Sequence, residues 1–144
     1  MQDHQPPSTT QPLELIQKIS EIIVSTRSLA FRSVDMLQVS MNFAIGQRIV
    51  EHEQEGEQRA KYGQRTLELL ADTLTHEFGK GFSLTNLKLM RQFYLTYHSR
   101  IGQTASDQSL YQVAEKTLSI KLPALSPISW SHYCELLILS DKNN

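Results

Sequence analysis

The sequence has few of the features that extracellular or membrane proteins need. It contains a single cysteine, Cys134, so no internal disulfide can form, which fits a reducing compartment. Its longest apolar runs are a few residues, far short of the roughly 20 that cross a membrane. No charged, apolar and small-residue sequence opens the chain. We therefore expect no membrane segment, no secretory signal and a cytoplasmic location.

Catalytic and metal-binding patterns are also missing. The sequence has no CxxC, HxxxH, GxxxxGK[ST] or GxSxG motif, and no Glu is followed two positions later by Lys, as nuclease chemistry would need. His132 and Cys134 lie two positions apart in an expected helix and therefore point in different directions. The sequence predicts a protein with no cofactor, no bound metal and no enzyme activity of its own.

Charge is balanced overall but unevenly distributed. The formal net charge is −1, and an acidic run occupies residues 51–57. Between residues 59 and 100, seven Lys or Arg stand against three Asp or Glu, so seven minus three gives a local charge of +4. Such an excess is typical of a phosphate-binding surface, and equally of an ordinary solvated face.

Helical periodicity dominates the chain after a polar start. Residues 1–12 contain prolines and no apolar period, which predicts a disordered tail. From Leu13 onward, apolar residues recur every three or four positions, first at Ile16, Ile19 and Ile23 and then at Ala30, Val34, Leu37, Met41, Ile45 and Ile49. This predicts one long helix, or two broken near residues 25–28, whose stripe lies in the core or in a helix–helix seam. We expect residues 13–144 to form a single all-α domain.

A helix-turn-helix-like pair is predicted over residues 62–94. The first helix has a core face of Leu67, Leu70, Ala71, Leu74 and Phe78. Gly79 and Gly81 permit the positive φ values of a turn, and Ser83 is a suitable N-cap for the second helix. That helix is expected to bury Leu87, Met90, Phe93, Tyr94 and Tyr97.

Two more helices are predicted in the C-terminal third. One runs over about residues 107–118, with Leu110, Val113 and Leu118 directed inward. Pro123 and Pro127 then favour an extended segment. Ser129 is the expected N-cap of a last, apolar helix that ends near Leu139 and contains Trp130 as a core anchor.

Three separated stretches carry a family resemblance. NFAIGQRIVEHEQEGEQRAKYG, LADTLTHEFGKGFSLTNLKLMRQFY and ISWSHYCELL resemble the N-terminal domain of the YhcG-type proteins, over roughly residues 29–139. In this bacterial family the helical domain precedes a predicted PD-(D/E)xK nuclease domain, which has no counterpart in this sequence. The chain departs from the family at Asn42-Phe43, where Tyr-Trp is common, and at Val34-Asp35, where Val-Asn is usual. The resemblance implies a non-catalytic DNA-binding or targeting module for a nuclease, sometimes found near restriction–modification genes.

The DNA-binding hypothesis names a set of contact residues. Thr85, Lys88 and Gln92 fall on the outer face of the second helix of the pair, from which base edges are contacted in a helix-turn-helix. The candidate phosphate contacts are Lys61, Arg65, Lys80, Lys88 and Arg91. The expected partners are DNA and a nuclease domain or restriction–modification protein.

An alternative hypothesis needs no contact with nucleic acid. The long apolar stripe and the apolar last helix also favour a protein-interaction or dimerisation module, with a homodimer as one form. The sequence leaves both hypotheses open.

Overall fold

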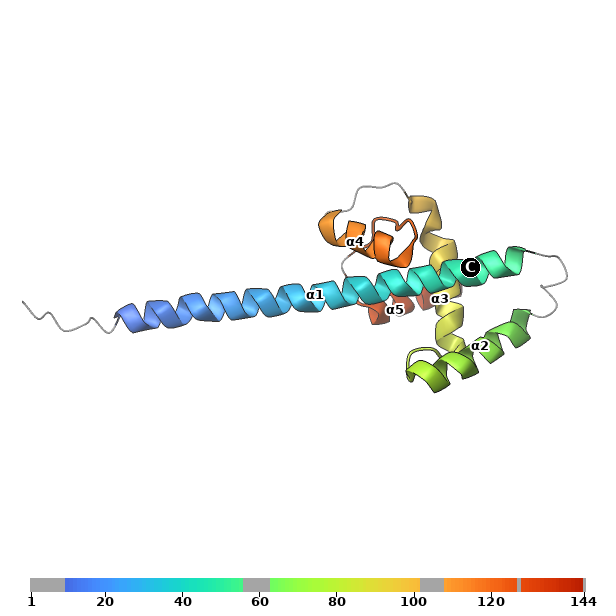
Figure 1. Ribbon diagram of the computed structural model, residues 1–144, viewed down its shortest axis with the longest axis horizontal. Coiled ribbons are helices and arrows are strands. Elements are labelled where there is room, and N and C mark those ends of the chain that lie inside the picture. Colours follow the sequence, from blue (N-terminus) through green and yellow to red (C-terminus); the bar gives the residue numbers. More distant parts are fainter. Residues whose placement is uncertain (1–9, 56–62, 102–107, 127, 144) are drawn as a thin grey trace, which may run out of the picture. The chain divides into compact units, whose positions relative to one another are not determined.

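Helices make up most of the part of the chain that the computed structural model describes, residues 10–55, 63–101, 108–126 and 128–143. The five α-helices are α1 (Thr10–Gln54), α2 (Gly63–Phe78), α3 (Leu84–Tyr97), α4 (Gln108–Leu118) and α5 (Trp130–Lys142), and a short 3-10 helix, η2 (His98–Arg100), follows α3 (Figure 1). Over those residues, extended backbone pairs only at an isolated bridge between Ile101 and Pro123. The prediction of an all-α fold with a long N-terminal helix is confirmed.

The chain divides into two compact units, Met1–Val34 and Asp35–Asn144. Helix α1 is continuous, so the alternative of two helices broken near residues 25–28 is not observed. It begins at Thr10 and therefore includes residues 10–12, which the sequence assigned to the tail; residues 1–9 lie outside the described part. In the first unit the large apolar side chains of α1 are exposed, whereas the second unit has a buried core.

In the second unit, α1 packs against α3 at a glycine. A Cβ atom on Gly46 would lie 2.1 Å from the carbonyl oxygen of Met90 and 3.0 Å from the Cβ of Tyr94. Next to this contact, the Phe43 ring packs edge-on against the rings of Phe93 at 5.8 Å and Tyr94 at 5.2 Å between centroids. The absence of a side chain at residue 46 is therefore what allows the two helices to approach so closely.

The buried face of α1 differs from the predicted stripe. Buried positions are Val39, Ser40, Asn42, Phe43, Gly46, Ile49 and Val50. Of the predicted stripe after residue 30, Val34 and Leu37 are exposed, Met41 and Ile45 are half-buried, and Ile49 is buried. The stripe therefore reaches the core only at its C-terminal end. The sequence did not predict that the face with Ser40 and Gly46 is also buried, because small or polar residues do not contribute to an apolar pattern.

Two predicted core residues on other helices are also exposed. Phe78, the last residue of α2, is 66% exposed, and the centroid of its ring lies 6.1 Å from that of the half-buried Phe82. On α4, Val113 is 58% exposed while Ala114 is fully buried. The orientation of α4 is set by Tyr111, whose hydroxyl group donates to the Leu125 carbonyl and accepts from the Leu125 N–H, both at 3.1 Å.

The last helix follows its prediction closely. Ser129 is the N-cap of α5, and its hydroxyl oxygen accepts from the backbone N–H of His132 at 3.4 Å. Trp130 is a buried anchor, and its ring packs 5.3 Å from that of Phe93. Tyr133 and Leu137 continue the same buried face, so α5 closes the core against α3.

Candidate nucleic-acid interface

The turn between α2 and α3 has the geometry that its glycines predicted. Gly79 has φ +83° and Gly81 has φ +108°, conformations that strain residues with a Cβ. Ser83 caps α3 as expected, since its hydroxyl oxygen accepts from the backbone N–H of Asn86 at 3.1 Å. The start of α3 is therefore fixed by local backbone and capping interactions.

Asn86 fixes the turn to the rest of the core. Its side-chain amide donates to the carbonyl of Gly81, and its side-chain oxygen accepts from the indole Nε1–H of Trp130 at 2.9 Å. One side chain thereby joins the turn, the first turn of α3 and the first residue of α5. This positions the first exposed residues of α3 on a rigid support, a role for Asn86 that the sequence did not predict.

Four of the seven predicted contact residues are exposed. Thr85 and Lys88 lie on the first two turns of α3, Arg65 lies on α2, and Lys80 lies in the turn between them. Their side chains therefore offer hydrogen-bond donors and positive charge to solvent. Lys61 lies outside the described residues.

The other two predicted residues are half-buried and contact acidic side chains. The Arg91 Nε–H group donates to both carboxylate oxygens of Glu53, on α1, at 2.7 and 3.0 Å. The side-chain amide of Gln92 donates to the Asp141 carboxylate, on α5, at 2.9 Å and to the Leu137 carbonyl at 3.5 Å. These contacts connect the middle of α3 to two other helices, so Arg91 and Gln92 contribute to the packing of the fold.

These residues share one open pocket of about 630 Å³. Its lining combines Lys88, Arg91 and Gln92 with the acids Glu53 and Asp141, and is completed by Gly63, Gln64, Leu67 and Leu95. An anion at this site would be attracted by the two cations and repelled by the two carboxylates. A phosphate group would therefore contact Lys88 directly, and would reach Arg91 only in competition with Glu53.

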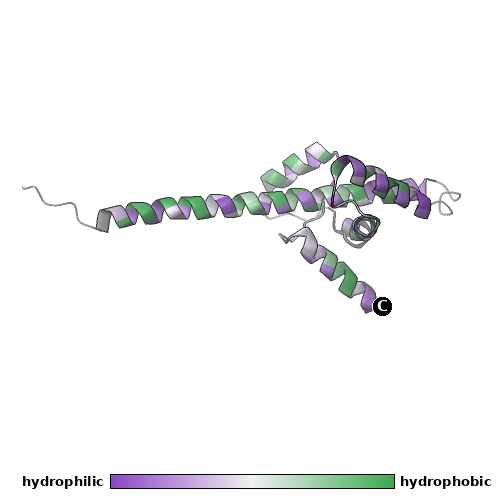
Figure 2. Cartoon of the chain, turned by 90° about the horizontal axis from the view of Figure 1, so that it is seen from below, coloured by the Kyte–Doolittle hydropathy of each residue, from purple (hydrophilic) through white to green (hydrophobic). Residues whose placement is uncertain are grey.

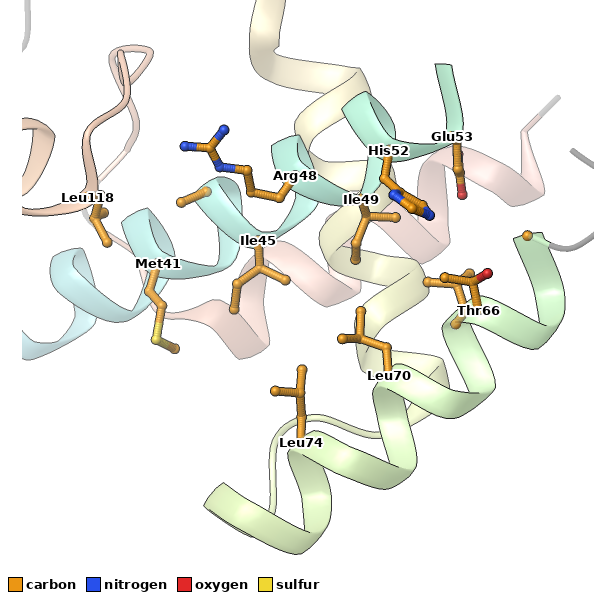
Figure 3. A pocket seen from close by; sticks show the side chains of 13 residues that line it. Met41, Ile45, Arg48, Ile49, His52, Glu53, Thr66, Leu70, Leu74 and Leu118 are labelled. Carbon is orange, nitrogen blue, oxygen red and sulfur yellow. The ribbon is translucent and has the colours of Figure 1, made fainter. Parts of the chain in front are cut away.

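A second, larger pocket of about 790 Å³ lies between α1 and α2 (Figure 3). Its walls are mainly apolar, with Met41, Ala44, Ile45 and Ile49 from α1, Leu67, Leu70 and Leu74 from α2, and Leu118 from α4. Arg48, His52, Glu53, Gly63 and Thr66 complete the lining, and Arg48 forms an ion pair with Glu51 at 3.2 Å. Such a lining suits an apolar group and not a phosphate.

The hydroxyl, imidazole and thiol groups of Ser129, His132 and Cys134, at the start of α5, belong to the structure of the helix and its packing. His132 Nδ1 and the Ser129 hydroxyl oxygen are 2.7 Å apart, but this hydroxyl caps α5. Burial raises the pKa of the Cys134 thiol, which lowers its nucleophilicity near neutral pH. Across residues 10–55, 63–101, 108–126 and 128–143, no three His, Cys, Asp or Glu residues are grouped as metal ligands. No helix within these ranges is long and apolar enough to span a membrane.

The described residues thus define an all-α domain with a capped helix-turn-helix-like pair. Residues 18–144 match the family described as the DUF1016 N-terminal domain, and the chain belongs to this family. It is also similar to "Putative nuclease YhcG" of Escherichia coli (strain K12), with 38% identity over 107 residues. The matched region is 74% of this chain and 28% of that protein, so the chain spans little more than a quarter of its relative. No solved structure matches the chain. The family resemblance predicted from the sequence is confirmed.

Proposed function

We propose that this chain is a non-catalytic module that binds duplex DNA through the start of α3 and targets a nuclease to it. The observation that carries the proposal is the rigid presentation of Thr85 and Lys88 on a helix whose first turn is held by Ser83 and Asn86. Residues at the start of the second helix are the ones that reach base edges in a helix-turn-helix. The similarity to a protein named as a putative nuclease supports nucleic acid as the partner.

The surrounding charge supports the same surface. Lys80 precedes α3 in the turn, Arg65 lies on α2, and Lys88 lies on α3 itself, all exposed. Phosphate contacts from these three side chains would set the position and orientation of α3, and Thr85, at the start of the same helix, is the candidate for a contact to a base. Because the chain has a net charge of −1, binding depends on these individual cations and not on the charge of the whole protein.

Arg91 and Gln92 have a secondary place in this proposal. Their side chains already interact with Glu53 and Asp141, so a DNA contact requires them to exchange or share these partners. The Arg91 side chain remains 40% exposed, so part of it is still in contact with solvent. We therefore place Lys88 at the centre of the interface and Arg91 at its edge.

A fluorescence-anisotropy titration with a mixed-sequence duplex at low salt tests this assignment. Lys88→Glu should weaken binding about tenfold or more, because it replaces an attraction to phosphate with a repulsion. The matched control is Lys116→Glu, which makes the same charge change on an exposed face of α4 and should change the affinity less than about twofold. Equal weakening in both variants would mean that only overall charge matters, and would refute α3 as the contact helix.

A protein-interaction or dimerisation module is the second candidate function. It is favoured by one specific observation, the exposed apolar side chains of α1 in the first unit. This candidate is compatible with DNA binding, because the two functions use residues in different units of the chain.

A further inference from the structure

In the first unit, the described residues 10–34 form the start of α1, and they bury none of its large apolar side chains. Between residues 13 and 34 of α1, ten large apolar side chains are each 45–71% exposed: Leu13, Leu15, Ile16, Ile19, Ile22, Ile23, Val24, Leu29, Phe31 and Val34. Apolar residues recur along this whole part of the helix (Figure 2). Exposed leucines scattered singly are ordinary, but a continuous set of this size marks an interaction surface.

The apolar residues cover most of the circumference of the helix. At about 100° per residue they occupy an arc of roughly 200°. The remaining strip is polar and consists of Glu14, Gln17, Lys18, Glu21, Ser25, Ser28 and Arg32. So wide an apolar arc, beside one clearly polar strip, is typical of a helix that packs between other helices while one edge stays in water.

The exposed area is sufficient for a stable interface. Ten such side chains offer on the order of 1,000 Å² per copy, compared with the roughly 800 Å² that each partner contributes to a standard interface. The stretch is about 33 Å long at 1.5 Å per residue, so two copies side by side can bury it along its whole length. A second copy of this chain supplies an identical surface and needs no further component.

The distribution of charge favours an antiparallel arrangement. Arg27 is the one charged residue between positions 13 and 34 that lies within the apolar arc. In a parallel pair the two Arg27 guanidinium groups would face each other, whereas in an antiparallel pair centred on residues 23–24 each lies opposite Ser20. The N-terminal half, with Glu14, Lys18 and Glu21, has a charge of −1, and the C-terminal half, with Arg27 and Arg32, has +2, so antiparallel copies also attract each other.

We propose that residues 13–34 of α1 pack antiparallel against the same residues of a second copy of this chain. This deepens the second candidate function and does not depend on DNA binding by residues 35–144. Because the apolar arc is wider than one seam, two such pairs can also join as a four-helix bundle with antiparallel neighbours.

Light scattering coupled to size exclusion tests the association with the full chain. The wild type should be a dimer or tetramer at about 10–100 µM, and Ile16→Lys with Ile23→Lys should make it a monomer. The control is Gln17→Lys with Ser28→Lys, which adds the same two charges to the polar strip of the same helix and should leave the assembly intact. Far-UV circular dichroism should show that both variants keep their helices. A monomeric wild type, or equal loss of assembly in both variants, would overturn the proposal.

Distances between spin labels test the orientation. In a Cys134→Ser background, a label at Glu14→Cys should be separated from its copy by about 28 Å along the axis, since position 14 lies opposite position 33. A label at Ser25→Cys, on the same side of the helix, should be offset by only about 4 Å along the axis. The pulsed dipolar distance should therefore be longer by about 10 Å or more at position 14. Equal distances at both sites would show parallel copies and refute the antiparallel arrangement. A monomeric protein would not bear on the proposed DNA binding, because duplex affinity is measured separately in the anisotropy titration.

Discussion

Replacing Gly46 with alanine should strongly disturb the packing of α1 on α3. The added Cβ would lie 2.1 Å from the Met90 carbonyl oxygen and 2.8 Å from its carbonyl carbon. Both atoms belong to the backbone of α3, so no flexible side chain can move to make room. The two helices would have to separate by about 1 Å, in a core where interior packing is as dense as in a crystal.

The size of the effect follows from two opposing contributions. Overpacking of this kind costs about 1–3 kcal/mol, and a rigid backbone neighbour places it towards the upper end. Alanine gains about 0.5–1 kcal/mol over glycine from helix propensity, which offsets part of the cost. The free energy of unfolding should therefore fall by roughly 1–2 kcal/mol. For a domain of this size the Tm should fall by roughly 3–10 °C.

Thermal unfolding followed by circular dichroism measures this directly. The matched control is Gly63→Ala, at the first residue of α2, where an added Cβ meets nothing within 4 Å. Its Tm should stay unchanged or rise slightly, because only the helix propensity changes. A Gly46→Ala protein as stable as the wild type would refute the proposed contact between α1 and α3.

Three further predictions concern the core and the interface. Asn86→Ala removes the acceptor of the Trp130 indole N–H and the donor to the Gly81 carbonyl. In a urea titration it should lower the free energy of unfolding by about 2–3 kcal/mol. The control Thr85→Ala, at an exposed neighbouring position, should change it by less than about 0.5 kcal/mol. Burial, with neighbouring Tyr97 and Tyr111, raises the pKa of Tyr133 to about 12, above its ordinary value of 10.0. The unfolded state therefore loses the hydroxyl proton at a lower pH than the folded state. The contribution of this group to stability should be constant below about pH 10 and fall by roughly 2 kcal/mol towards pH 12. Tyr133→Phe should make this decline smaller. Glu53→Gln removes the carboxylate partner of Arg91 and should tighten duplex binding about twofold to tenfold. The control Glu135→Gln makes the same charge change on an exposed face of α5 and should leave the duplex affinity unchanged.

Local signals in the sequence predicted the elements and caps of the helix pair. Gly79, Gly81 and Ser83 act through their own backbone and side chain, so their effect can be recognised without knowledge of the fold. Ser129 and Trp130 were predicted for the same reason, and both have the expected positions. The outward orientation of Thr85 and Lys88 likewise follows from the period of α3.

Long-range contacts could not be predicted in this way. Arg91 and Glu53 are 38 residues apart, and Gln92 and Asp141 are 49 residues apart, so no local pattern links them. The part of the buried face of α1 around Gly46 was not predicted, because a glycine contact determines it and glycine does not contribute to an apolar stripe. Residues 13–34 have a clear apolar pattern, but only the structure shows that the large apolar side chains of this unit are exposed.

The salt dependence of duplex binding by the wild-type chain tests the central claim most directly. Contacts to phosphate from Lys88, Arg65 and Lys80 predict that log K falls with log salt concentration with a slope of about −3. The measurement is an anisotropy titration with a mixed-sequence duplex at several salt concentrations from about 50 to 200 mM. Binding with a slope near this value, reduced by about one in Lys88→Glu, would support the α3 interface. No binding at the lowest salt, or binding that salt does not weaken, would contradict a role in DNA recognition.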